Sequence, residues 1–224
     1  MSKEKKIKRA QTIGEEIANS ISHGVMALFA IFALIMMIIK SQNGWQLAAS
    51  IVFGLSMFLL YISSTLYHAL SFTKAKGLFK RFDHISIYML IGGTFAPIFL
   101  LLPSFQEPLF GIENFISIGL SLFIGQWLLI LLGIILKSIW VYKFQTMHVI
   151  IFLLIGWSGL YFMYDLYHFS MASMWLILLG GLSYSLGVIF YKKSNKEYFH
   201  FIWHIFVGMG TILQFLAIYN YFIV

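Results

Sequence analysis

Long apolar runs separated by short polar gaps dominate the chain. A helix needs about 20 mostly apolar residues to cross roughly 30 Å of hydrocarbon, so each run is long enough to span a membrane. The pattern predicts seven spans, at about residues 17–39, 45–69, 82–102, 115–136, 145–164, 171–191 and 199–222. We therefore expect an all-α fold, a polytopic bundle of seven transmembrane helices. It would form a single domain, residues 17–224, after a basic cytoplasmic tail at residues 1–16.

Composition supports this class. The 224 residues are 60% hydrophobic and only 10% charged, whereas a soluble domain is nearer half apolar and a quarter charged. The chain contains no cysteine, which excludes disulfides and thiolate metal sites. Any metal ion must therefore be held by imidazole and oxygen ligands.

The distribution of lysine and arginine predicts the orientation of the bundle. With seven spans, 14 of the 15 basic residues fall on one side, and only Lys40 falls on the other. Cytoplasmic loops carry the excess of positive charge, so the N-terminus is expected in the cytoplasm and the C-terminus outside. The net charge of +7 then reflects topology and gives no reason to expect a nucleic acid partner. The basic residues of the predicted cytoplasmic side are Lys3, Lys5, Lys6, Lys8, Arg9, Lys74, Lys76, Lys80, Arg81, Lys137, Lys143, Lys192, Lys193 and Lys196.

Three histidines and one aspartate are expected at the same depth, near this cytoplasmic face. His200 and His204 begin the last span, four residues apart and therefore on one face of a helix. His68 ends the second span, and Asp83 begins the third. Three protein ligands with a fourth position left for water are typical of catalytic zinc sites. Ser64 lies one helical turn before His68, so its hydroxyl is expected to point into the same region.

Each of these residues also has a plain structural interpretation. Histidines at a membrane interface often serve as anchors, and Asp83 could simply pair with Lys80 or Arg81. Other histidines near the same face, His84 and His148, could replace one of the three ligands. The segment between His200 and His204 contains no glutamate, so this is not the HExxH arrangement, and Asp83 is the natural candidate for a general base.

Four segments together resemble a known family. They are EEIANSISHG, SSTLYH, RFDHISIYMLIGGTFAP and HFIWH, which begin at residues 15, 63, 81 and 200. In this order they are similar to the signature segments of the hemolysin III branch of the progestin and adipoQ receptor (PAQR) family. The wider superfamily includes alkaline ceramidases and adiponectin receptors. The resemblance implies seven helices, zinc ligands His68, His200 and His204, and a bound water beside Ser64 and Asp83.

The predicted function is a zinc-dependent hydrolase of a lipid amide or ester in the cell membrane, with a membrane lipid as substrate. Two alternatives stay open: a membrane receptor or sensor whose zinc is structural, and a cytolysin that causes hemolysis. The second is disfavoured as a direct pore because the middles of the spans are nearly free of charge. Glu16, Asn19 and His23 share one face of the first helix, and the sequence assigns them no definite chemistry.

Overall fold

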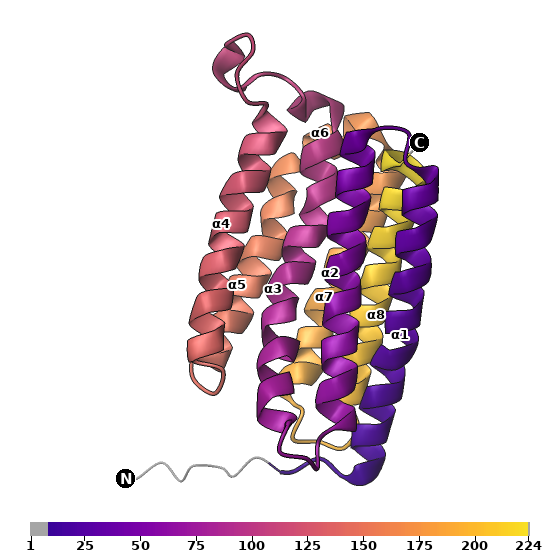
Figure 1. The fold of residues 1–224 in the computed structure, drawn as a ribbon, viewed down its shortest axis with the longest axis vertical. Coiled ribbons are helices and arrows are strands. Elements are labelled where there is room, and N and C mark those ends of the chain that lie inside the picture. The colour runs from indigo at the N-terminus through magenta and orange to yellow at the C-terminus, as the bar shows by residue number, and fades with distance from the viewer. Residues whose placement is uncertain (1–8, 224) are drawn as a thin grey trace.

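The computed structural model describes residues 9–223 as a bundle of long helices whose axes are roughly aligned (Figure 1). Seven helical segments of this part of the chain are long and apolar enough to cross a membrane, which confirms the predicted fold class. The chain is a multi-pass membrane protein. The α-helices are α1 (Ile13–Lys40), α2 (Gly44–Ala69), α3 (Lys76–Leu101), α4 (Ile118–Ile139), α5 (Gln145–Trp157), α6 (Met163–Phe169), α7 (Met171–Lys192) and α8 (Phe199–Ala217). Three short 3-10 turns, η1 (Pro103–Phe105), η2 (Leu109–Gly111) and η3 (Ser158–Phe162), and a final π turn, η4 (Ile218–Phe222), complete it.

Short polar residues start four of the spans. Thr12 caps α1 in a capping box with Glu15, and Asn43, Ser117 and Ser170 accept backbone hydrogen bonds at the starts of α2, α4 and α7. Such caps satisfy N–H groups that have no partner within the helix. The polar gaps between the apolar runs therefore also define where the helices begin.

Two helices begin several residues earlier than the hydrophobic pattern predicts. Helix α1 starts at Ile13, inside the predicted tail, and residues 1–8 of that tail lie outside the described part of the chain. Helix α3 starts at Lys76 instead of residue 82, because the basic residues ahead of the apolar run are good helix formers. Asp83 consequently lies about two turns inside α3 rather than at its start.

The fifth span is not one continuous α-helix. Helix α5 ends at Trp157, and η3 links it to α6. Glycine and serine are poor helix formers, and three of them lie within four residues here, Gly156, Ser158 and Gly159. The Ser158 hydroxyl also donates to the Ile155 carbonyl at 2.6 Å, which competes with regular helical bonding.

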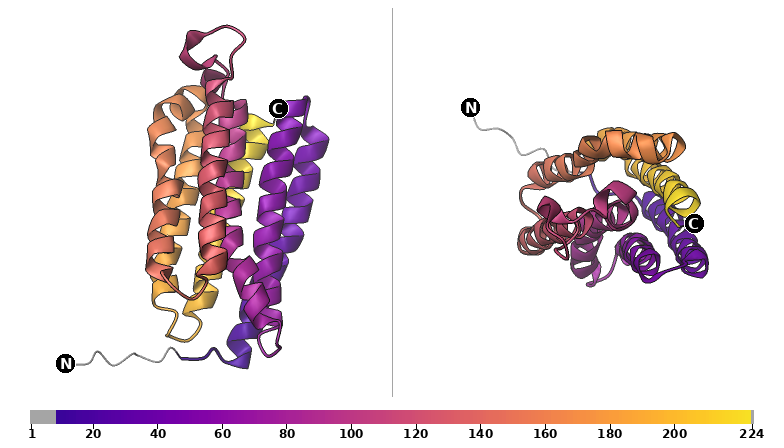
Figure 2. Two further views of the ribbon diagram at one scale, coloured as in Figure 1. Left: turned by 60° about the vertical axis from the view of Figure 1, so that its left-hand side comes forward. Right: turned by 90° about the horizontal axis from the view of Figure 1, so that it is seen from above.

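The helices surround an interior in which α3 is the most buried span. Helices α1 to α4 follow one another as neighbours, and α8 packs against both α7 and α1 (Figure 2). Close approach of α2 and α3 depends on Gly93, because a Cβ there would collide with the Ser56 side chain. This connectivity brings the last turns of α2, α4 and α7 and the first turns of α3, α5 and α8 to one end of the bundle, the end at the bottom of Figure 1.

Candidate metal centre

Three imidazoles meet at this end of the bundle. His68 comes from the last turn of α2, and His200 and His204 come from the first two turns of α8. One ring nitrogen from each lies within 4.8 Å of the others. The ring centroids of His200 and His204 are 4.7 Å apart, and each is 5.1 Å from that of His68. Among the described residues, these three form the group of side chains that could hold a metal ion.

Helix α1 orients His68 through a buried carboxylate. The Nδ1 of His68 and Oε2 of Glu16 are 2.6 Å apart, and the two side chains are almost fully buried. Because an ionised carboxylate only accepts, this bond assigns the proton to Nδ1 and leaves the lone pair on Nε2. Lys76 also approaches Glu16, with 3.4 Å between Nζ and Oε1. Carboxylate–histidine pairs of this kind commonly hold metal ligands in place.

The same helix orients His204. Its Nδ1 lies 3.2 Å from the Asn19 carbonyl oxygen and 3.1 Å from Ser22 Oγ. A carbonyl can only accept, so Nδ1 carries the proton and Nε2 is the free ligand atom. His23 supports the other side of the ring, stacked on His204 with a centroid separation of 3.5 Å.

The donor set fits a metal ion. His68 Nε2 is buried and has no hydrogen-bond partner, which is costly for a polar atom unless a ligand satisfies it. Three imidazoles suit zinc and several other transition metals. With Zn–N distances of about 2.0–2.1 Å, the three nitrogens would draw slightly closer together than they lie here. His68, His200 and His204 would then hold the ion.

Ser64 and Asp83 lie beside the three imidazoles. Both line a cavity whose wall also includes His200 and His204. Ser64 is almost fully buried, and its hydroxyl faces the Asp83 carboxylate without forming a hydrogen bond of standard geometry. A serine hydroxyl and a carboxylate therefore line the same cavity as two of the three imidazoles.

The alternative third ligands lie outside this group. His148 is bonded through Nδ1 to the Tyr88 hydroxyl at 2.7 Å and belongs to α5. His84 lines the cavity but is not among the three histidines whose ring nitrogens cluster. Glu16, Asn19 and His23 were left without a role by the sequence. The sequence signal was that these residues share one face of α1. Only the packing of α1 against α2 and α8 shows that this face contacts His68 and His204.

Comparison with known proteins places the chain in a family. The family model described as haemolysin-III related matches residues 11–215, nearly the whole chain. The chain belongs to the haemolysin-III related family. The matched range includes all four segments that carry the sequence resemblance, so the predicted membership is confirmed.

Three known proteins are similar to this chain over most of their lengths. A Hemolysin-3 homolog from Bacillus subtilis (strain 168) is 39% identical over 94% of this chain and 95% of its own. Hemolysin-3 from Bacillus cereus is 35% identical over 97% of this chain and 96% of its own. The human Monocyte to macrophage differentiation factor is 26% identical over 94% of this chain and 85% of its own. The similarity to these three proteins therefore extends over nearly the whole of this chain.

The contact between Glu16 and His68 leads to a testable expectation. Glu16→Gln keeps the size of the side chain but removes its charge, and it should weaken metal binding about 10- to 100-fold. Titration of the purified protein against a competing chelator measures this change. Glu113→Gln, in the exposed loop before α4, is the matched control and should bind metal as the wild type does. Equal affinities for the wild type and Glu16→Gln would show that Glu16 does not tune the site.

Proposed function

We propose that this chain is an intramembrane zinc-dependent hydrolase that cleaves a lipid amide or ester. The ligands of the zinc ion would be His68, His200 and His204. When bound to three imidazoles, zinc keeps a position for water and lowers the pKa of that water toward about 7.

The observation that carries this proposal is that the histidine cluster borders a cavity. His200 and His204 line it together with Ser64 and Asp83, so a fourth position on a metal ion would face open space. A purely structural metal site is normally closed by a fourth protein ligand. Within residues 9–223, the cluster of possible ligands contains three side chains and no fourth.

Asp83 and Ser64 have the chemistry that amide or ester hydrolysis requires. The Asp83 carboxylate would accept a proton from the attacking water and return it to the leaving amine or alcohol. The Ser64 hydroxyl would donate a hydrogen bond to the oxygen that gains charge at the carbonyl carbon. Both groups come from helices and are therefore held more rigidly than loop residues would be.

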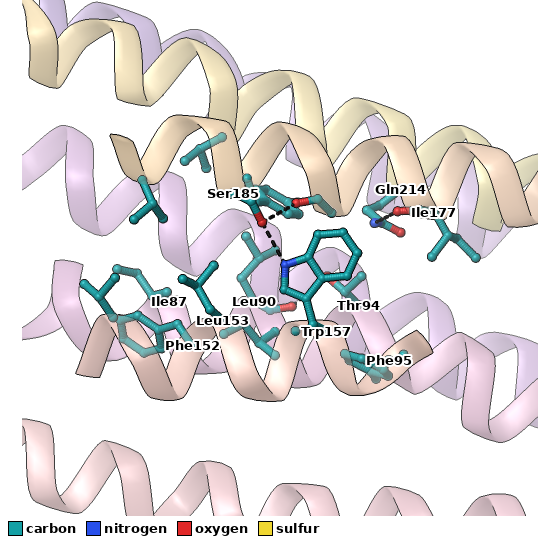
Figure 3. Close-up of a pocket in the computed structure, with 18 of the residues that line it drawn as sticks. Ile87, Leu90, Thr94, Phe95, Phe152, Leu153, Trp157, Ile177, Ser185 and Gln214 are labelled. Atoms are coloured by element: carbon teal, nitrogen blue, oxygen red, sulfur yellow. Dashed lines mark hydrogen bonds between the residues drawn. The ribbon is translucent and has the colours of Figure 1, made fainter. Parts of the chain in front are cut away.

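A second, mostly apolar cavity supports a lipid substrate. It adjoins the first, and His84, Tyr191 and Trp203 line both. It continues between α3, α5 and α7, where Leu90, Phe152 and other apolar side chains point into it (Figure 3). An acyl chain could lie there while its carbonyl group reaches the metal. The concentration of lysine and arginine in the loops at this end supports a position near the cytoplasmic face.

The name of one relative suggests a second function. Hemolysin-3 of Bacillus cereus is 35% identical, which makes cytolysis a candidate for this chain as well. Hydrolysis of membrane lipids would be one route to lysis. Cytolysis would then be a consequence of the proposed reaction, and hemolysis is to be measured once lipid turnover has been established.

The proposal is tested by metal content and turnover of the purified protein. We expect about one zinc ion per chain by plasma mass spectrometry, and release of fatty acid from at least one N-acyl or ester lipid in proteoliposomes. Removal of zinc should abolish turnover, and re-addition should restore it. One zinc per chain without turnover on any lipid would favour the receptor with structural zinc. Folded protein that neither contains nor binds zinc would overturn the proposal.

A further inference from the structure

A lysine is buried in the wall of the apolar cavity. Lys137 lies in the last turn of α4, lines the cavity, and is only 2% exposed. Among residues 9–223, no carboxylate lies within 4.0 Å of its ammonium group, and the side chain makes no hydrogen bond. A lysine near a membrane interface normally extends its ammonium group into water. A buried ammonium without a counter-ion is expensive, and such groups within membrane spans usually serve a function.

The groups around Lys137 are basic or neutral. His84, His148 and Lys80 lie close enough to interact with it electrostatically. His148 is 1% exposed, and its Nε2 has no hydrogen-bond partner although its Nδ1 is bonded to Tyr88. Two neighbouring polar groups, the Lys137 ammonium and His148 Nε2, thus find no hydrogen-bond partner among residues 9–223. This end of the cavity offers positive charge, and no aspartate or glutamate is among the described residues that line it.

The rest of the cavity has the opposite character. Beyond Lys137, His84, Gln145 and His148, its wall consists mainly of aliphatic and aromatic side chains, and Phe152 and Leu153 of α5 lie opposite Leu90 of α3 (Figure 3). Further along, Trp157 Nε1 donates a hydrogen bond to Ser185 Oγ at 2.9 Å, which joins α5 to α7. A ligand complementary to this cavity has one anionic end and one long apolar end.

We propose that Lys137 and His148 form a binding site for the headgroup of an anionic single-chain lipid, with its acyl chain in the apolar cavity. The anion is a carboxylate or a phosphate monoester. Either accepts from the Lys137 ammonium, and from His148 Nε2 in the tautomer whose Nδ1 accepts a hydrogen bond from the Tyr88 hydroxyl. Binding at this site does not depend on the metal. Its link to turnover does rest on the proposed function: hydrolysis of a lipid amide or ester releases a fatty acid carboxylate, which belongs to the class of ligand that this site fits. His84, which lines both cavities, lies between the metal centre and Lys137.

The test is direct binding of radiolabelled oleate to the full-length protein in detergent, by scintillation proximity. Lys137→Met removes the charge but retains a long apolar side chain, and it should weaken oleate binding about tenfold or more. Lys143→Met makes the same change in charge at an exposed position six residues along the chain and should leave binding unchanged. Lys137→Arg keeps the charge and should retain most of the affinity. If Lys137→Met does not purify as a folded protein, Lys137→Gln replaces it.

Competing ligands identify what the site recognises. Unlabelled oleate and oleoyl lysophosphatidate should displace the label, whereas methyl oleate, which has the same chain without the charge, should compete at least about tenfold more weakly. Competition by millimolar inorganic phosphate as effective as that by oleate would show a free-anion site and overturn a lipid site. Equal binding of oleate to the wild type and Lys137→Met would also overturn the proposal. Oleate binding should persist in His200→Ala/His204→Ala, so a failure of the zinc hydrolase is distinguishable from a failure of this site.

Discussion

Replacing His200 and His204 with alanine is expected, on the proposed function, to remove zinc and all turnover together. Two of the three imidazoles that lie within 4.8 Å of one another come from this pair. A single remaining histidine cannot hold zinc, since protein zinc sites use three or four protein ligands. Zinc content should fall from about one per chain to below about 0.1. The rate of hydrolysis should fall by more than about 100-fold, which is the largest effect expected from losing a residue that only hydrogen-bonds to a ligand, such as Glu16.

The control for this experiment is His168→Ala. His168 lies in α6, toward the opposite end of the bundle from the three histidines, and it is exposed. The variant should keep both zinc and activity. Both variants should retain the helical circular dichroism of the wild type, because seven spans and their caps stay intact. Full zinc content in the double variant would place the metal elsewhere in the chain.

Asp83→Asn is expected to separate chemistry from metal binding. The substitution keeps the shape of the side chain but removes its ability to accept a proton, so the zinc content should stay near one per chain. Turnover should fall by roughly 10²- to 10⁴-fold, the usual contribution of a general base. The measurement is kcat on the best lipid substrate, normalised to the zinc content of each preparation.

Ser64→Ala is the companion variant. It should lower kcat by up to about 10²- to 10³-fold, the range for one lost donor to a developing oxyanion. If Asp83→Asn lost zinc in proportion to activity, Asp83 would be a ligand or a support of the metal rather than a base. If it kept full activity, the base would have to be sought among the other groups of the cavity.

The sequence predicted much of the fold because the membrane limits what a chain can do. Seven apolar runs must become seven helices, and because successive spans cross in opposite directions, alternate loops lie at the same end. This reasoning brings His68, His200 and His204 to one depth, and the four-residue spacing of the last two puts them on one face. The structure brings these three together as that argument expects.

What the sequence could not predict depends on which helices become neighbours. The hydrogen bond between Glu16 and His68 joins residues 52 positions apart, and nothing in the spacing along the chain specifies it. Lys137 shows the same limit in a different way. Because Lys137 follows an apolar run, the sequence predicts a loop lysine that only determines the orientation of the chain in the membrane. In the structure α4 continues to Ile139, and the Lys137 side chain is buried in the wall of a cavity. Helix ends shift by a few residues, and at this site such a shift changes the role of a residue.

The position of α1 at the edge of the bundle has a thermodynamic consequence. This helix contributes no member of the histidine cluster, and only 28% of its apolar 18-residue stretch is buried inside the bundle. It nevertheless holds two of the histidines, His68 through Glu16 and His204 through Asn19 and Ser22. Detachment of α1 would release both rings at once, so metal affinity and the docking of α1 are reciprocally linked. If docking of α1 raises the affinity for a metal ion by some factor, binding of the ion raises the equilibrium constant for docking of α1 by the same factor.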